Sequence, residues 1–254
     1  MSKKKIKIHK EMPFLDHLEE LRWRILKSLG SIILFTLIAF PFSEKLLNFL
    51  TAPNDGLKNP AEIIFLKPTG ALIVRMEASL VVGIIASSVV IFHQMWQFIA
   101  PGLLPNEKKY FFPGLISTLF CFGAGIAFSY YGLIPIVLPI LYGMGTETIK
   151  AKINLNDYIG FVLRLILVSG LIFELPVISF ILTRVGLLTP EFLRKYRRYG
   201  IVLIFILAAI ITPPDPASQL TMALPLILLY EISIIVSRVA SKRRKSAEEE
   251  TINS

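Results

Sequence analysis

The 254-residue chain is unusually rich in apolar residues. Hydrophobic residues make up 54% of it, charged residues only 18%, and the mean hydropathy is +0.65, whereas an ordinary soluble domain has about 25% charged residues. These values exclude a soluble globular domain and a disordered chain. The net charge of +9 comes from basic blocks between apolar runs, a pattern that reports membrane orientation rather than nucleic-acid binding. The sequence predicts an all-α integral membrane protein that binds no nucleic acid.

The N-terminal 27 residues are polar and carry eight Lys and Arg residues. No small-residue cleavage site follows the first apolar run, so we expect the first span to be retained. The single cysteine, Cys121, lies in an apolar run without partners for a disulfide or a metal site. We therefore expect Cys121 in the core, and neither a metal ion nor a cofactor.

Six apolar stretches follow, and a transmembrane helix needs about 20 mainly apolar residues. The third is followed by Pro135 and Pro139, which predict an apolar loop after about Gly132. In chain order, the predicted spans are Ser28–Ser43 (extended at its start by Ile25 and Leu26), one within Ala78–Asn106 (a stretch that also holds part of a loop), Tyr110 to about Gly132, Tyr158–Thr183, Tyr199–Pro214 and Leu220–Ser237.

Basic residues predict the orientation of this six-helix layout. The N-terminus, the C-terminus and the loops on their side carry 20 Lys and Arg residues, and the opposite loops carry 5. Because Lys and Arg gather on the cytoplasmic side, both termini are predicted to be cytoplasmic. The chain then forms one membrane domain over residues 1–254, with a cytoplasmic N-terminus (1–24), a membrane region (25–237) and a charged tail (238–254).

The last two helices are predicted to be short. Gly200–Ile211 spans about 18 Å at 1.5 Å per residue, less than a hydrocarbon core of about 30 Å, and Leu220–Ser237 is only just long enough. Prolines 213 and 214 stop the fifth helix. Asp215 and Gln219 supply polar groups to the link that follows. Asp215 either caps the sixth helix or, with Gln219, belongs to a site where partner helices dock.

The segment before the first span has the pattern of an amphipathic helix. Phe14, Leu18 and Leu21 recur at helical spacing, which is typical of a helix lying at the membrane interface. Glu20 and Arg22 fall at its junction with the membrane. The alternative is a solvated helix start with no further role.

The second cytoplasmic loop, Phe98–Tyr110, contains two prolines and one glycine that interrupt the helix. Glu107 is the only acid in this loop. It is either a functional acid on an otherwise basic face or a cap for the next helix.

Glu174 lies well inside the fourth predicted span, beside Pro176. An ionisable group at membrane depth predicts a functional site, and we expect Glu174 to face a concave, partly hydrated pocket open to lipid or to a partner helix. The alternative is a structural hydrogen bond to a neighbouring helix. Arg164 is about 15 Å away along the helix, too far for direct pairing. Glu231 and Arg238 in the last helix are expected to be interface residues.

Motifs for catalysis are missing from the sequence. It contains no HExxH metal motif, no GxSxG nucleophile turn, and no Walker A or GxGxxG phosphate loop. The sequence therefore predicts a protein that is not an enzyme, and one that takes energy from a partner or from the membrane gradient.

Taken together, four short motifs in this order resemble those of the TatC family, the multispanning core of the twin-arginine protein translocase. The resemblance runs from about Phe14 to Arg238. The motifs are His17–Arg22 (HLEELR), Phe98–Leu103 (FIAPGL) with Glu107, Phe173–Val177 (FELPV) and Thr212–Gln219 (TPPDPASQ).

The resemblance implies a receptor in the cytoplasmic (inner) membrane that binds twin-arginine signal peptides and helps to export folded proteins, using the proton-motive force. It also implies an oligomeric complex with the single-span subunits TatA and TatB. Glu20 and Glu107 match the signal-binding acids of the family. The implied sites are a signal-peptide site of Glu20, Glu107, Arg22, Phe98, Pro101 and Leu103, and an intramembrane partner site of Glu174, Asp215 and Gln219.

The alternative function is a proton-coupled small-solute transporter with Glu174 as the proton carrier. Such a transporter should show internal repeats and several polar groups at the membrane midplane. The sequence has no convincing repeat and offers one acid at this depth.

Overall fold

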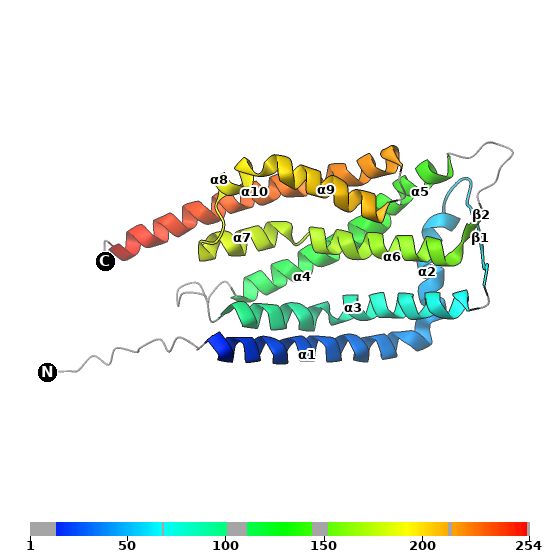
Figure 1. The fold of residues 1–254 in the computed structure, drawn as a ribbon, viewed down its shortest axis with the longest axis horizontal. Helices are drawn as coiled ribbons and strands as arrows, with labels where there is room; N and C mark the ends of the chain where they lie inside the picture. Colours follow the sequence, from blue (N-terminus) through cyan, green and yellow to red (C-terminus); the bar gives the residue numbers. More distant parts are fainter. Residues whose placement is uncertain (1–13, 68, 101–110, 144–151, 213–214, 253–254) are drawn as a thin grey trace.

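The computed structural model describes residues 14–67, 69–100, 111–143, 152–212 and 215–252, and most of these residues are helical. The long helices run roughly side by side (Figure 1). The start of α1, the end of α10 and the short helix α8 lie at one end of the molecule, and α2, β1 and β2 lie at the other. This arrangement places the described ends of the chain on the same side.

The predicted amphipathic segment and the first span form a single helix, α1 (Phe14–Ala39). It leads through a 3₁₀ turn (Phe40–Phe42) into α2 (Ser43–Asp55). Helix α1 lies along α3 (Gly70–Ile99), and the two come close because Gly83 has no side chain, since a Cβ there would overlap Thr36. The other apolar side chains of α1 are largely exposed, as expected for a helix that faces lipid.

The third span is longer than predicted. Helix α4 (Phe111–Phe128) continues through a π-helical turn (Ser129–Leu133) into α5 (Ile134–Tyr142). The prediction of a loop after Gly132 was therefore wrong. Pro135 directly follows the π-helical turn, and the helix continues past it. Pro139 is accommodated inside α5, as prolines often are in membrane helices when neighbouring groups satisfy the freed backbone.

The fourth span consists of two helices, α6 (Leu155–Ile172) and α7 (Leu175–Val185), with a break at Phe173 and Glu174. Pro176 lies in the first turn of α7, a position that suits proline. Helix α6 is the centre of the core and packs against α3 and α4. Gly125 of α4 permits the close crossing with α6, because a Cβ there would lie 2.7 Å from the Ser169 carbonyl oxygen.

Three helices complete the bundle: α8 (Pro190–Lys195), α9 (Arg197–Ile211) and α10 (Pro216–Ile252). Helix α9 has 15 residues, or about 22 Å, which confirms that it is short. Helix α10 has 37 residues and is longer than predicted. It continues beyond Ser237 because Lys, Arg, Ala and Glu, which dominate the tail, are good helix formers.

A two-stranded parallel sheet of β1 (Glu62–Ile64) and β2 (Lys152–Asn154) joins two loops at the end opposite α8. The Lys152 ammonium lies 3.0 Å from a Glu62 carboxylate oxygen. Nearby, Asn54 of α2 exchanges two hydrogen bonds with the backbone of Ala61, and the Tyr142 hydroxyl donates to Asn54 Oδ1 at 3.1 Å. These contacts fix α2 across this end of the bundle.

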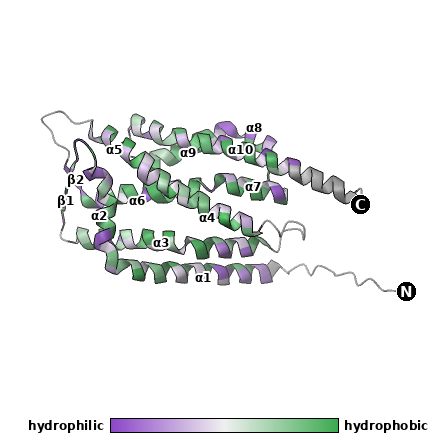
Figure 2. Cartoon of the chain, turned by 180° about the vertical axis from the view of Figure 1, so that it is seen from behind, coloured by the Kyte–Doolittle hydropathy of each residue, from purple (hydrophilic) through white to green (hydrophobic). Residues whose placement is uncertain are grey.

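The hydropathy of the helices matches a membrane environment. Hydrophilic residues gather at the start of α1 and in α8, whereas the middle parts of α1, α3 and α4 are mostly hydrophobic (Figure 2). Five described segments are long and apolar enough to cross a membrane: Asp16–Asp55, Gly70–Ile99, Phe112–Tyr142, Leu155–Val185 and Pro216–Lys242. The chain is therefore a multi-pass helical membrane protein, and the crossing by the shorter α9 stays a prediction.

Candidate functional site

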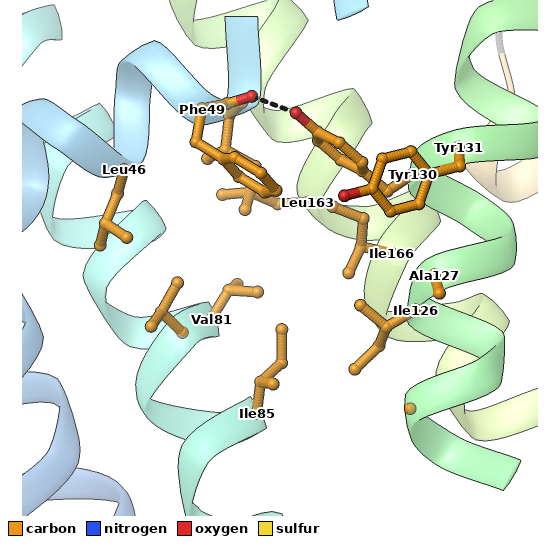
Figure 3. Close-up of a pocket in the computed structure, with 13 residues that line it drawn as sticks. Leu46, Phe49, Val81, Ile85, Ile126, Ala127, Tyr130, Tyr131, Leu163 and Ile166 are labelled. Atoms are coloured by element: carbon orange, nitrogen blue, oxygen red, sulfur yellow. Dashed lines mark hydrogen bonds between the residues drawn. The ribbon is translucent and has the colours of Figure 1, made fainter. Parts of the chain in front are cut away.

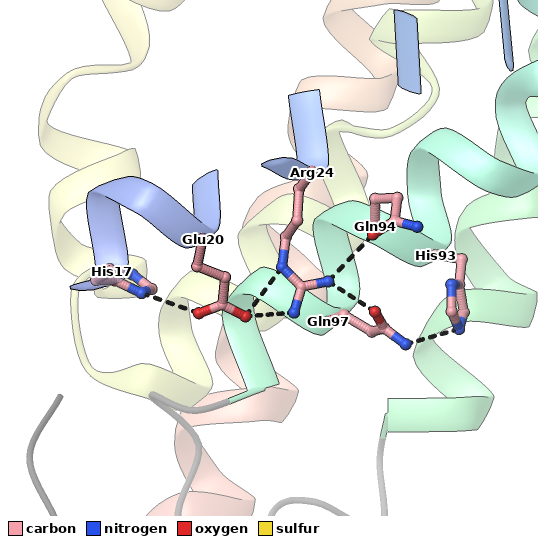
Figure 4. Close-up of polar contacts among 6 residues, drawn as sticks. All are labelled: His17, Glu20, Arg24, His93, Gln94 and Gln97. Carbon is pink, nitrogen blue, oxygen red and sulfur yellow. Dashed lines mark hydrogen bonds and ion pairs between the residues drawn. The ribbon is translucent and has the colours of Figure 1, made fainter. Parts of the chain in front are cut away.

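A cluster of polar side chains lies where the start of α1 meets the end of α3 (Figure 4). Its centre is Glu20, one turn before Arg24 on α1. Arg24 donates to Glu20 Oε1 from Nε at 3.0 Å and also from Nη2. The Glu20 and Arg24 side chains are 22% and 17% exposed, so their ion pair is partly shielded from water.

Two glutamines of α3 bind the other side of the Arg24 guanidinium. Arg24 Nη1 donates to Gln97 Oε1 at 2.6 Å and to Gln94 Oε1 at 3.2 Å. The Gln97 amide in turn lies 3.2 Å from His93 Nε2. Gln94 and Gln97 are one turn apart on α3, so both can face the same guanidinium. Arg24 therefore links the two helices and holds the carboxylate of Glu20.

The second oxygen of Glu20 is in a different position. Oε2 is buried and lies 3.5 Å from His17 Nδ1, yet it accepts no hydrogen bond from the described residues. The His17 ring stacks on Phe98, with centroids 4.2 Å apart and planes 8° from parallel. Oε2 therefore has an ion-pair contact with His17 but no close hydrogen-bond donor among the described residues, so it keeps the capacity to accept a further donor.

The structure brings together only part of the predicted signal-peptide site. Glu20 and Phe98 lie on either side of His17, and Arg22 is exposed on the same helix. Pro101, Leu103 and Glu107 lie outside the described residues, so their place beside Glu20 stays a prediction.

Sequence reasoning missed Arg24, Gln94 and Gln97. Arg24 and Gln97 are 73 residues apart, and no local spacing relates them. The one available signal was the run of His93, Gln94 and Gln97 near the end of an otherwise apolar segment, because polar groups in such a segment need partners.

Glu174 lies at the break between α6 and α7 and is 4% exposed. Its Oε1 has no hydrogen-bond partner among the described residues. The predicted open, partly hydrated pocket around Glu174 was therefore wrong for this chain by itself. Close to this break, α4 crosses α6 with Phe122 against Gly170. Glu174 remains a buried polar group at membrane depth.

Asp215 and Gln219 have clear structural roles at the start of α10. Asp215 Oδ2 accepts a 2.7 Å hydrogen bond from the Ser218 N–H, which confirms the prediction that Asp215 caps this helix. The same bond holds the pKa of Asp215 below its ordinary value. Gln219 Nε2 donates to the Phe205 carbonyl oxygen at 3.0 Å and ties α10 to α9. The partner site that includes them stays a prediction.

Glu231 of α10 pairs with a residue of α9. Its Oε1 lies 2.6 Å from Arg197 Nε, so the pair joins α10 to α9. Arg164, by contrast, is exposed on α6 and donates from Nε to the Gly160 carbonyl oxygen at 2.9 Å.

A cavity of about 220 Å³ lies among α2, α3, α4, α6 and the π-helical turn (Figure 3). Its only side-chain polar atoms are the hydroxyls of Tyr130 and Tyr131, and the Tyr130 hydroxyl donates to the Phe49 carbonyl oxygen at 2.6 Å. The lining residues are Leu46, Phe49, Leu50, Val81, Val82, Ile85, Gly123, Ile126, Ala127, Tyr130, Tyr131, Leu163 and Ile166. Such a cavity suits apolar chains and offers no binding groups for an ion or a polar solute. In the part of the chain that the structure describes, no group of His, Cys, Asp and Glu side chains could hold a metal ion.

Comparison with known proteins identifies the family. The family model described as Sec-independent protein translocase protein (TatC) matches residues 16–225. The TatC protein of Aquifex aeolicus is 38% identical over 239 residues, which cover 93% of this chain and 99% of that protein. TatC of Desulforapulum autotrophicum is also 38% identical, over 94% of this chain and 88% of its own length. Bacillus subtilis TatCy is 33% identical over 96% of both chains.

A solved structure agrees in fold. A crystal structure described as the twin arginine translocase receptor TatC superposes with a TM-score of 0.81 at 37% identity, over 89% of this chain and 99% of that one. The family match, the relatives and the shared fold each cover most of the chain. The chain therefore belongs to the TatC family of Sec-independent protein translocase proteins.

Proposed function

We propose that this chain is the receptor subunit of a twin-arginine translocation system in the cytoplasmic membrane, and that it binds signal peptides with paired arginines at the Glu20 cluster. One observation carries the proposal. Glu20 Oε2 is a buried carboxylate oxygen that accepts no hydrogen bond from the described residues, beside the stacked rings of His17 and Phe98.

The chemistry of this cluster favours an arginine of the ligand. Hydrogen bonds from a guanidinium to a carboxylate are among the strong ones in proteins, and they contribute about 1.5–3 kcal/mol each. A guanidinium is also less strongly hydrated than an ammonium and can stack on an aromatic face, which the ring of His17 or Phe98 offers here. The His17 side chain is 39% exposed, so it has room to move aside when the ligand enters.

Glu107 is proposed as the second acid, which would read the other arginine of the pair. Lys108 and Lys109 follow it directly and are the nearest charges in sequence. These lysines would repel cationic peptides that cannot pair with both acids. Pro101 and Leu103 are proposed as apolar contacts for the residues that flank the arginines, and the apolar part of the signal would lie along the spans.

The proposed partners are folded client proteins with twin-arginine signals and single-span subunits of the TatA and TatB type. Glu174, Asp215 and Gln219 are the proposed intramembrane partner site, and transport would draw on the proton-motive force. The described cavity favours this function over a solute transporter, because its lining is apolar and a polar solute needs several polar groups.

The proposal is tested by exchanging Glu20 and Glu107 for glutamine, singly and together, in the full chain. Each exchange keeps the side-chain shape and removes the negative charge. We expect each variant to insert and fold, to bind a twin-arginine signal peptide less tightly, and to block export of a folded client. Exchange of Glu191 for glutamine on the exposed surface of α8 is the matched control. Unchanged export by the double variant would refute the proposed site.

A further inference from the structure

We propose that Arg24 is the positioning residue of the signal site: it fixes the Glu20 carboxylate so that Oε2, and not Oε1, receives the incoming guanidinium. This inference rests on the proposed function of Glu20 and goes beyond it. It assigns roles to Arg24, Gln94 and Gln97, three residues for which the sequence motifs suggested none.

The Arg24 guanidinium bridges Glu20 on α1 and two glutamines on α3. Arg24 uses Nε and Nη2 on Glu20 Oε1, and Nη1 on the two glutamine oxygens (Figure 4). A planar guanidinium with donors on two edges can meet acceptors on both sides at once. Glu20 is therefore oriented from α3, although it belongs to α1.

The two carboxylate oxygens of Glu20 have different contacts. Oε1 is filled by Arg24, and Oε2 receives no hydrogen bond from the described residues. A carboxylate accepts donors on both oxygens, so a ligand guanidinium can bind Oε2 without displacing Arg24. The charge of Arg24 would repel a second cation, but the shared carboxylate lies between them and offsets this repulsion.

The contacts of Arg24 also preorganise the Glu20 side chain for binding. A free glutamate side chain on a helix surface samples several rotamers, and a ligand must stop this motion when it binds. Here Arg24 restricts the rotation of the Glu20 side chain before a ligand arrives, and Gln94 and Gln97 hold Arg24 in place. A lysine at position 24 keeps the positive charge but donates from a single ammonium. It cannot span Glu20 and both glutamines in the same planar arrangement.

The test is a double-mutant cycle on signal-peptide binding by the purified full chain. We expect Arg24→Lys to weaken binding of a twin-arginine peptide about tenfold, which corresponds to about 1.4 kcal/mol. In the Glu20→Gln background, the same exchange should cause almost no further loss, because Arg24 acts through Glu20. A purely structural role in α1–α3 packing would instead give equal losses in both backgrounds.

A second variant keeps both charged residues in place. Gln94→Leu with Gln97→Leu removes the acceptors on α3. We expect this double variant to bind the peptide less tightly when residue 20 is glutamate, and to cause no further loss when residue 20 is glutamine. Arg194→Lys, on the exposed surface of α8, is the matched control and should bind as the unmodified chain does. Thermal unfolding of every variant in detergent reports on its fold.

The outcomes separate the two proposals. If Glu20→Gln binds the peptide normally, the proposed function of Glu20 fails, and the role of Arg24 fails with it. If Glu20→Gln weakens binding but Arg24→Lys does not, or if the two losses simply add, the site stands and the positioning role of Arg24 is overturned.

Discussion

Asp215 and Glu174 are two acids of one chain in opposite surroundings. Asp215 lies at the start of α10, where the Ser218 N–H donates to its carboxylate. Glu174 is 4% exposed at the break between α6 and α7, and its Oε1 has no donor among the described residues. The first acid stabilises a helix, whereas the second is a buried acid with one carboxyl oxygen that has no hydrogen-bond partner among the described residues.

Asp215→Ala is predicted to lower the thermal unfolding midpoint of the protein by a few degrees, because α10 loses its cap. The pKa of Asp215 lies below its ordinary value of about 3.8 because the Ser218 N–H binds the carboxylate. The stabilising contribution is therefore present at neutral pH and is lost as the pH falls through this lowered pKa. The difference between Asp215→Ala and the unmodified chain should shrink in acid. Asp215→Asn should unfold at nearly the original temperature at neutral pH, since asparagine also caps helices.

Glu174 is predicted to contact a polar residue of a partner helix only during transport. In the chain alone it is buried, so a partner can reach it only if the helices around it rearrange. A photoreactive side chain at position 174 should crosslink to a TatA-type helix when a folded client and the proton-motive force are both present. Crosslinks of equal yield at rest, or none under either condition, would contradict this prediction.

At the scale of elements, the hydropathy pattern predicted the spans but not all of their ends. Apolar runs located α1, α3, α6 and α9 because a membrane helix must be apolar along its whole crossing. The loop predicted after Gly132 failed because Pro135 was taken as a helix breaker, whereas the helix continues past it. The end predicted at Ser237 failed because hydropathy reports the membrane boundary, and a helix can continue beyond it.

The site was less predictable than the fold. Glu20 and Phe98 stood out in short motifs, and the structure places both against His17. Arg24 and its glutamine partners depend on the register between α1 and α3. That register is set by side-chain packing along the two helices, for example Gly83 against Thr36, and a single sequence does not reveal such contacts.

The short helix α9 is predicted to be needed for export. Its 15 residues span about 22 Å, so the bilayer beside it must thin or a partner must cover the mismatch. Insertion of four apolar residues near Leu203 would lengthen α9 by about 6 Å. We expect this variant to insert and to bind signal peptide, but not to export a folded client. Full export would show that the length of α9 has no role in transport.

In the whole molecule, the Glu20 cluster lies at the end where α1 begins. The start of α1, α8 and the end of α10 are found there, and the sheet of β1 and β2 closes the other end (Figure 1). Between the two ends, the described cavity is apolar.

The central claim is that the Glu20 end of this chain recognises paired arginines. The most direct measurement is the affinity of the purified full-length protein for a twin-arginine signal peptide and for the same peptide with both arginines replaced by lysine. The peptides carry equal charge, so the comparison isolates guanidinium recognition from simple attraction. We predict that the twin-arginine peptide binds at least about tenfold more tightly, as expected when one charge-assisted hydrogen bond distinguishes two ligands. Equal affinity for the two peptides would contradict the claim.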